Sequence, residues 1–131
     1  MPVLAILETA LYAGDLRAAE RFYAGVLGLE IESAGSGRHV FFRCGDGMLL
    51  VFDPAVTSQS TGAVPRHGAT GPGHVAFSVD DLEAWPDRFR AAGVPVEADV
   101  AWPGGGRSIY VRDPAGNSVE LTTPGIWGIG S

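Results

Sequence analysis

The stretch "GHVAFSVDDL" (residues 73–82) has a counterpart, "LETALYAGDL" (residues 7–16), near the start of the chain. In each stretch an apolar segment with the composition of a strand leads to an aspartate followed by a leucine. Setting Glu8 on His74 superposes the two Asp-Leu pairs. A match of this kind indicates an internal repeat, in which one structural unit occurs twice.

The repeat continues along the chain. "GLEIE" from Gly28 matches "GVPVE" from Gly93, and "GRHVFFRCGDGMLLVF" from Gly37 matches "GRSIYVRDPAGNSVEL" from Gly106. Each half therefore has the plan of a strand, a helix and three further strands. Expected strands lie at residues 4–13, 29–34, 38–44, 47–53, 95–100, 107–112 and 118–123, in addition to the one that begins at residue 74.

Local signals place the helices and turns. Asp15 is the expected N-cap of the first helix, and Gly28 is placed to end it. The second helix is expected to start late, because Pro86 would break a hydrogen bond beyond the first turn. "GDG" and "RDPAGN" are expected to form the turns before the last strand of each half.

The predicted fold class is α+β, in a single domain over residues 1–131. A segment rich in Gly, Pro, Ser and Thr separates the two halves and reads as a linker or surface loop. The predicted parts are module 1 at 4–53, the linker at 54–72, module 2 at 73–123 and a C-terminal tail at 124–131.

Composition excludes several classes of function. The net charge is -6, and the nine basic residues, all arginines, are scattered, so nucleic acid is not an expected partner. No apolar run is long enough to cross a membrane, and no basic leader precedes the first apolar residues. Cys44 is the only cysteine, which suits a reducing compartment, and a cytoplasmic location is expected.

The paired halves, together with "DLRAAERFYAGVLGLE", "GHVAFSVDDL" and "YVRDPAGNSVEL", resemble the vicinal oxygen chelate superfamily. That family includes glyoxalase I, extradiol dioxygenases, and fosfomycin- and bleomycin-resistance proteins. The resemblance implies two βαβββ modules that form an open, curved, eight-stranded barrel-like cup with the helices outside. It also implies a homodimer, in which the modules pair either within one chain or between two.

The resemblance implies metal ligands on the first and last strands of each module. The first-strand positions are Glu8 and His74, and an offset of 69 residues between the last strands equates Val51 with Glu120. Glu8, His74 and Glu120 are therefore the predicted ligands of one divalent ion, such as Mn²⁺, Fe²⁺, Ni²⁺ or Zn²⁺. Each also has a structural interpretation, as a satisfied strand histidine or an exposed strand carboxylate. If Glu8 faces solvent, two ligands remain.

Further residues are candidates for binding a small-molecule substrate. Tyr110, Ser108 and His39 occupy inner-strand positions that line the pocket in the family, and Arg107 could hold an anion. Tyr110 could equally be a core aromatic residue, and Arg107 a solvated one. The loop at 102–107 is either a lid or a plain hairpin connection, and the role of Trp127 in the tail is open. His67, in the linker, is expected to be exposed and without a role.

The favoured function is a metal-dependent lyase or isomerase of the glyoxalase-like group that chelates two neighbouring substrate oxygens. Glu120 or Glu8 would serve as proton shuttle. One alternative is a metal-free protein that binds a drug or metabolite, like the bleomycin-resistance proteins. The second is an extradiol-type dioxygenase, which is less favoured because those enzymes have two histidine ligands and this chain offers only His74.

Overall fold

The computed structural model describes residues 1–35 and 37–129. Ser36, inside predicted module 1, and residues 130–131, at the end of the predicted tail, lie outside the described residues. The chain divides into two compact units, Met1–Gly71 and Pro72–Ser131, called unit 1 and unit 2 below. Most of the predicted linker thus belongs to unit 1.

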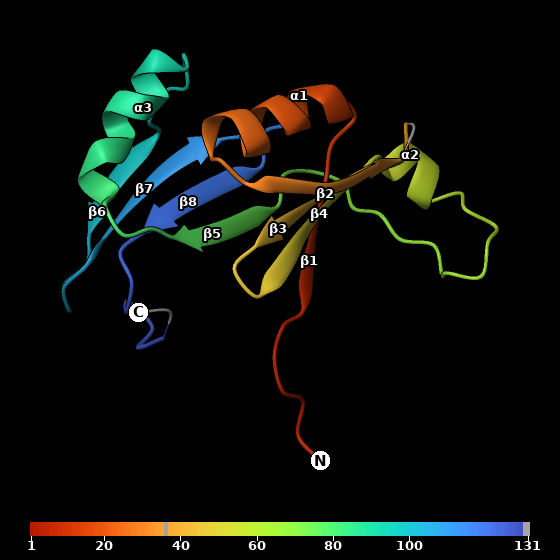
Figure 1. Cartoon of the computed structure of the whole chain (residues 1–131), viewed down its shortest axis with the longest axis horizontal. Helices are drawn as coiled ribbons and strands as arrows, with labels where there is room; N and C mark the ends of the chain where they lie inside the picture. The colour runs from red at the N-terminus through yellow and green to blue at the C-terminus, as the bar shows by residue number, and fades with distance from the viewer. Residues whose placement is uncertain (36, 130–131) are drawn as a thin grey trace. The chain divides into compact units, whose positions relative to one another are not determined.

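Unit 1 contains one four-stranded sheet with the strand order β1-β4-β3-β2 (Figure 1). β1 runs parallel to β4, and the other neighbouring strands are antiparallel. The elements are β1 (Glu8–Tyr12), α1 (Leu16–Glu20), the π-helical η1 (Arg21–Val26), β2 (Glu30–Gly35), β3 (His39–Cys44), β4 (Gly47–Phe52) and α2 (Pro54–Thr57).

The helical segment of unit 1 is held by its cap and by packing. The Asp15 side chain accepts a hydrogen bond from the backbone N–H of Ala18 at 3.0 Å, as expected of an N-cap. Gly28, just beyond the segment, has a φ of 81°, which favours glycine. Tyr23 of η1 and Phe42 of β3 are both fully buried, with ring centroids 5.6 Å apart. The apolar stripe of the helix therefore packs on one face of the sheet.

Unit 2 repeats this plan, with strand order β5-β8-β7-β6 and β5 parallel to β8 (Figure 1). Its elements are β5 (His74–Ser78), the 3-10 helix η2 (Leu82–Ala84), α3 (Trp85–Ala91), β6 (Ala98–Ala101), β7 (Arg107–Arg112) and β8 (Ser118–Thr122). Pro86 lies in the first turn of α3, so the late start of this helix is confirmed. The two βαβββ modules are confirmed as well.

The first strand is shorter than predicted. A strand was expected over residues 4–13, but β1 covers only Glu8–Tyr12. Its pairing with β4 starts with Glu8 opposite Met48. Just before the strand, the Leu7 carbonyl still accepts a hydrogen bond from the Met48 N–H of β4. β4 begins at Gly47, so it offers no further partner to residues 4–6.

The predicted match of Val51 with Glu120 is wrong by one residue. Within the sheets, Ala10 lies opposite Leu50, and the equivalent Ala76 lies opposite Glu120. Leu50 is therefore the counterpart of Glu120, while Val51 points to the other face. The cause is the turn before the last strand, which is one residue longer in unit 2 than in unit 1. Leu50 cannot bind a metal ion either, so the candidate ligands are unchanged.

None of the helices in the described part of the chain has the length and apolar character needed to span a lipid bilayer.

The β6–β7 hairpin depends on its last glycine. Gly106 has a φ of 89°, and a Cβ added there would lie 2.7 Å from Cγ2 of Ile126 and 3.0 Å from Oγ1 of Thr123. Gly104, two residues earlier, has an ordinary φ and no atom within 4 Å of such a Cβ.

Gly106→Ala is therefore expected to lower the free energy of unfolding by about 2–4 kcal/mol, through the unfavourable φ and the steric clash. Gly104→Ala is the matched control and is expected to change it by less than about 0.5 kcal/mol. Urea denaturation followed by circular dichroism measures both. Equal effects of the two substitutions would contradict this account of the hairpin.

Candidate functional site

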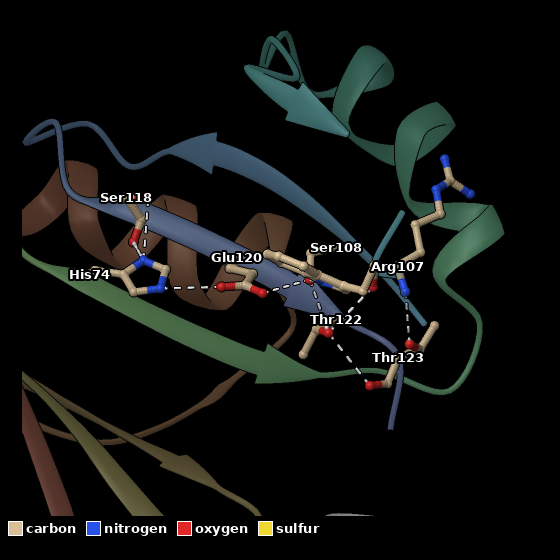
Figure 2. Close-up of polar contacts among 8 residues, drawn as sticks. His74, Arg107, Ser108, Ser118, Glu120, Thr122 and Thr123 are labelled. Carbon is tan, nitrogen blue, oxygen red and sulfur yellow. Dashed lines mark hydrogen bonds and ion pairs between the residues drawn. The ribbon is translucent and has the colours of Figure 1, made fainter. Parts of the chain in front are cut away.

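His74 and Glu120 come together on one face of the unit 2 sheet (Figure 2). β5 and β8 are neighbours, with His74 opposite Ser118 and Ala76 opposite Glu120. His74 and Glu120 are thus diagonal neighbours on the same face, and His74 Nε2 lies 3.2 Å from Glu120 Oε1. The structure brings these two predicted ligands into direct contact.

The hydrogen bonds of His74 fix the orientation of its ring. Nδ1 lies 3.1 Å from the Ser118 carbonyl oxygen, which can only accept, and 3.2 Å from the Ser118 hydroxyl (Figure 2). The hydrogen therefore belongs on Nδ1, and in the neutral ring Nε2 presents a lone pair. That lone pair faces a Glu120 carboxylate oxygen, so the two atoms present a nitrogen and an oxygen donor to the same point, where a metal ion could bind.

Glu120 is held from its other side by a chain of hydrogen bonds. The Ser108 hydroxyl donates to Glu120 Oε2 at 2.6 Å and accepts from Trp102 Nε1–H at 2.9 Å. Thr122 Oγ1 lies 3.1 Å from the same hydroxyl oxygen. Ser108 is fully buried and Glu120 is 6% exposed, so the carboxylate has little freedom to turn.

Tyr110 borders the pair. It lies opposite Glu120 in the pairing of β7 with β8, and its ring is stacked near that of His74, with centroids 6.3 Å apart and planes 22° apart. Burial, first, and the Glu120 carboxylate, second, raise the pKa of the Tyr110 phenol. The phenol therefore stays protonated at neutral pH and can donate a hydrogen bond.

Arg107 does not belong to this group of side chains. Successive residues of a strand point to opposite faces, and Arg107 immediately precedes Ser108. Its guanidinium points away from the His74–Glu120 pair (Figure 2), and it binds Asp99 at 2.6 and 2.7 Å and Glu83 at 2.5 Å. These carboxylates raise the pKa of Arg107 and already satisfy its charge, so its predicted role in substrate binding gains no support.

The remaining predicted site residues lie in unit 1. Glu8 is exposed and shares a face of β1 with Ala10 and Tyr12. The ring of His39 stacks on Phe41, with centroids 4.0 Å apart, and burial followed by the charge of Arg38 lowers the His39 pKa. His39 is therefore a neutral side chain at pH 7.

His67 was expected to be exposed and without a role, but it is half-buried and makes specific contacts within unit 1. Its Nδ1 lies 2.7 Å from the Tyr12 hydroxyl, and its ring meets Phe52 edge-on, with centroids 4.6 Å apart. The backbone N–H of His67 also donates to the Thr57 carbonyl, which anchors this part of the predicted linker to the end of α2. A lone histidine in a Gly- and Pro-rich stretch carries no periodic signal that would have revealed this contact.

Trp102 is a second residue that the sequence did not assign to the site. It was considered only as part of a loop, yet its indole N–H reaches the hydroxyl of Ser108 across the hairpin. The one signal in the sequence that could have indicated this contact was the position of a tryptophan between two expected neighbouring strands.

The described residues of either unit contain no group of three His, Cys, Asp or Glu side chains placed to hold a metal ion. Unit 2 supplies two donors, and Glu8 belongs to unit 1. The three-residue ligand set therefore stays a prediction.

Replacing Glu120 with Gln is expected to lower the pKa of Tyr110 toward 10.0, because the substitution removes a negative charge beside the phenol. The absorbance of tyrosinate measures this pKa, with Tyr110→Phe subtracted to isolate Tyr110 from the other two tyrosines. Glu20→Gln, in unit 1, is the control and should leave the pKa unchanged. A Tyr110 pKa that does not respond to Glu120→Gln would contradict the contact.

The same raised pKa has a consequence for stability. The folded state keeps the Tyr110 proton to a higher pH than the unfolded chain does, so this contribution to the free energy of unfolding is complete below pH 10.0 and is lost as the pH rises above it.

Known proteins resemble this chain over most of its length. It is 30% identical over 128 residues to the "Probable lactoylglutathione lyase" of Vibrio parahaemolyticus, with 88% of each chain covered. It is also 30% identical to the "Lactoylglutathione lyase" of Haemophilus influenzae, covering 88% of this chain and 90% of that protein. The crystal structure of lactoylglutathione lyase from Agrobacterium tumefaciens matches with a TM-score of 0.93 and 50% identity, covering 98% of this chain and all of the other.

These similarities confirm the predicted fold class and the predicted family. The model of the Glyoxalase/Bleomycin resistance protein/Dioxygenase superfamily matches residues 5–121, and the chain therefore belongs to that superfamily.

Proposed function

We propose that this protein is a metal-dependent enzyme of the glyoxalase-like group, with lyase or isomerase activity on a small molecule that carries two neighbouring oxygens. The observation that carries the proposal is the 3.2 Å contact between His74 Nε2 and Glu120 Oε1. The relatives named lactoylglutathione lyase support an enzyme of the lyase class. A homodimer and a cytoplasmic location stay predictions.

The residues of unit 2 fit a divalent ion. His74 directs Nε2 at the site because Nδ1 is bonded to Ser118, an arrangement usual for metal-binding histidines. Glu120 offers Oε1, while Oε2 is occupied by Ser108. An imidazole nitrogen with a carboxylate oxygen suits Mn²⁺, Fe²⁺, Ni²⁺ or Zn²⁺. Glu8 is the proposed third ligand.

When bound, such an ion polarises the substrate oxygens and stabilises the negative charge that develops on them. The chain's own groups would do the rest. Tyr110, which stays protonated, would donate a hydrogen bond to a substrate oxygen. Glu8 or Glu120 would take and return a proton, and of these Glu120 already has partners for both of its oxygens.

Glu120→Gln is expected to abolish metal retention, because the amide removes the anionic donor while keeping the shape of the side chain. Glu97→Gln is the matched control, since Glu97 also lies in unit 2 but is exposed and paired with Arg112. Elemental analysis of protein purified without chelator should give about one divalent ion per chain for wild type and control. The thermal transition of the metal-free variant should stay close to wild type.

Activity is tested in the direction of thioester formation, with glutathione and a small 2-oxoaldehyde, by following the thioester absorbance with the wild-type protein and with Glu120→Gln. The proposal expects turnover that requires the metal and is lost in the variant. Wild-type protein that retains no ion after incubation with Mn²⁺, Ni²⁺ and Zn²⁺ would contradict it and favour the metal-free binding protein instead.

Trp102 is expected to act as a positioning residue for Glu120. Trp102→Phe keeps an aromatic ring but removes the N–H that fixes the Ser108 hydroxyl, and metal affinity should fall by up to roughly tenfold. Trp127→Phe, at an 82% exposed position, is the control. Isothermal titration with Mn²⁺ measures both, and equal affinity of the two variants would show that the Trp102 bond does not support the site.

A further inference from the structure

The sheet of unit 1 carries a cavity that includes Glu8, the proposed third metal ligand, and extends to residues that the proposed metal site does not use. The cavity has a volume of about 670 Å³, within the range of small-molecule sites. Its wall includes the rings of Tyr12, Phe41, Phe52 and His67, with Glu8 and Arg38 as the charged residues. A mostly apolar wall that includes aromatic rings and a few polar groups is typical of a site for an organic ligand.

The aromatic rings form walls suited to a flat ligand. Phe52 is at the centre, with ring centroids 5.4 Å from Phe41, 6.3 Å from Tyr12 and 4.6 Å from His67. The 2.7 Å hydrogen bond between Tyr12 and His67 ties the segment after α2 to β1 on this wall. Such rings attract planar unsaturated groups through stacked or edge-on contacts.

Arg38 supplies a positive charge at this cavity. Its guanidinium lies over the Phe52 ring, 5.4 Å from the centroid, and Nη1 lies 3.2 Å from His39 Nδ1. Among the described residues no carboxylate forms an ion pair with Arg38, whereas Arg43, on the same strand pair, is bound to Glu32. In a chain of net charge -6, a cation in an aromatic cavity without an acidic partner points to an anionic ligand.

The two charged residues give the cavity a direction. Phe52 lies between Tyr12 of β1 and His39 of β3 at one end of the sheet. Arg38 directly precedes His39, so it belongs to the same end as Tyr12. Glu8 begins β1 four residues earlier, roughly 13 Å from Tyr12 along the strand. An anionic group would thus bind at Arg38 and would be repelled from Glu8.

We propose that this cavity binds a small organic carboxylate with a planar, unsaturated body, its carboxylate on Arg38 and its ring against the aromatic side chains. The inference rests on the proposed function at one point: it takes this ligand class as the substrate. The reason is that Glu8, at this cavity, is also the proposed third metal ligand. Binding by Arg38 and the rings requires no metal, so it can be measured separately.

The probe is 2-naphthoate, titrated into chelator-treated, metal-free full-length protein and followed by isothermal titration calorimetry. Wild-type protein should bind 2-naphthoate at least about tenfold more tightly than 2-naphthamide, the neutral analogue of the same shape. This comparison uses the unmodified protein and does not depend on any variant folding.

Arg38→Gln should weaken 2-naphthoate binding by roughly ten- to a hundredfold, because a charged hydrogen-bond donor is lost. Arg43→Gln is the matched control, as Arg43 is already neutralised by Glu32, and it should bind like wild type. Circular dichroism verifies that both variants are folded. Absence of 2-naphthoate binding at millimolar concentration, equal binding of the amide, or equal losses in both variants would each overturn the proposal.

If 2-naphthoate binds as described but no metal is retained, the ligand class stands and the metal-dependent function fails. If metal is retained but 2-naphthoate does not bind, the metal-dependent function stands and the proposed ligand class fails.

Discussion

The site depends on the Glu120 carboxylate and the His74 imidazole, whose nearest atoms lie 3.2 Å apart. Each group is held by hydrogen bonds on the side that faces away from the other. The Ser118 carbonyl oxygen holds the His74 ring from one end, and the Ser108 hydroxyl holds Glu120 from the other. Glu120 is buried, so turning it away from Ser108 would leave a buried carboxylate oxygen unsatisfied, which is costly, whereas His74 is half exposed and is held by its bonds to Ser118. A metal ion could bind to both donor atoms, and this makes the pair a candidate metal centre.

Of the two halves of the duplicated fold, unit 2 alone carries such a pair among the described residues. The two sheets have the same strand order, and Leu50 stands where unit 2 has Glu120. With Met48 opposite Glu8 and Leu50 beside it, unit 1 offers an apolar face where unit 2 offers a polar one. The same fold thus supplies a donor pair in one module and an aromatic cavity in the other, because function depends on the side chains a fold carries and not on the fold alone.

Much of the fold could be predicted from the sequence, because strong local signals marked it: Asp15 and Gly28 bound the first helix, and Pro86 delayed the second. The His74–Glu120 pair followed from the repeat and the family resemblance. The register of the last strand could not be predicted in this way. The turn before that strand is one residue longer in unit 2, and a shift of one residue moves every side chain to the other face of the sheet. The contacts of Trp102 and His67 join segments that no periodic pattern connects. The ion pairs of Arg107 with Asp99 and Glu83 are tertiary contacts as well, which the sequence could not predict.

The most direct measurement is anomalous X-ray scattering from crystals of the protein soaked in Mn²⁺ or Zn²⁺. The account predicts a single strong peak within bonding distance of both His74 Nε2 and Glu120 Oε1, with the Nδ1 bond to Ser118 intact. A peak elsewhere in the molecule, or none at this pair with both side chains in their present positions, would contradict it.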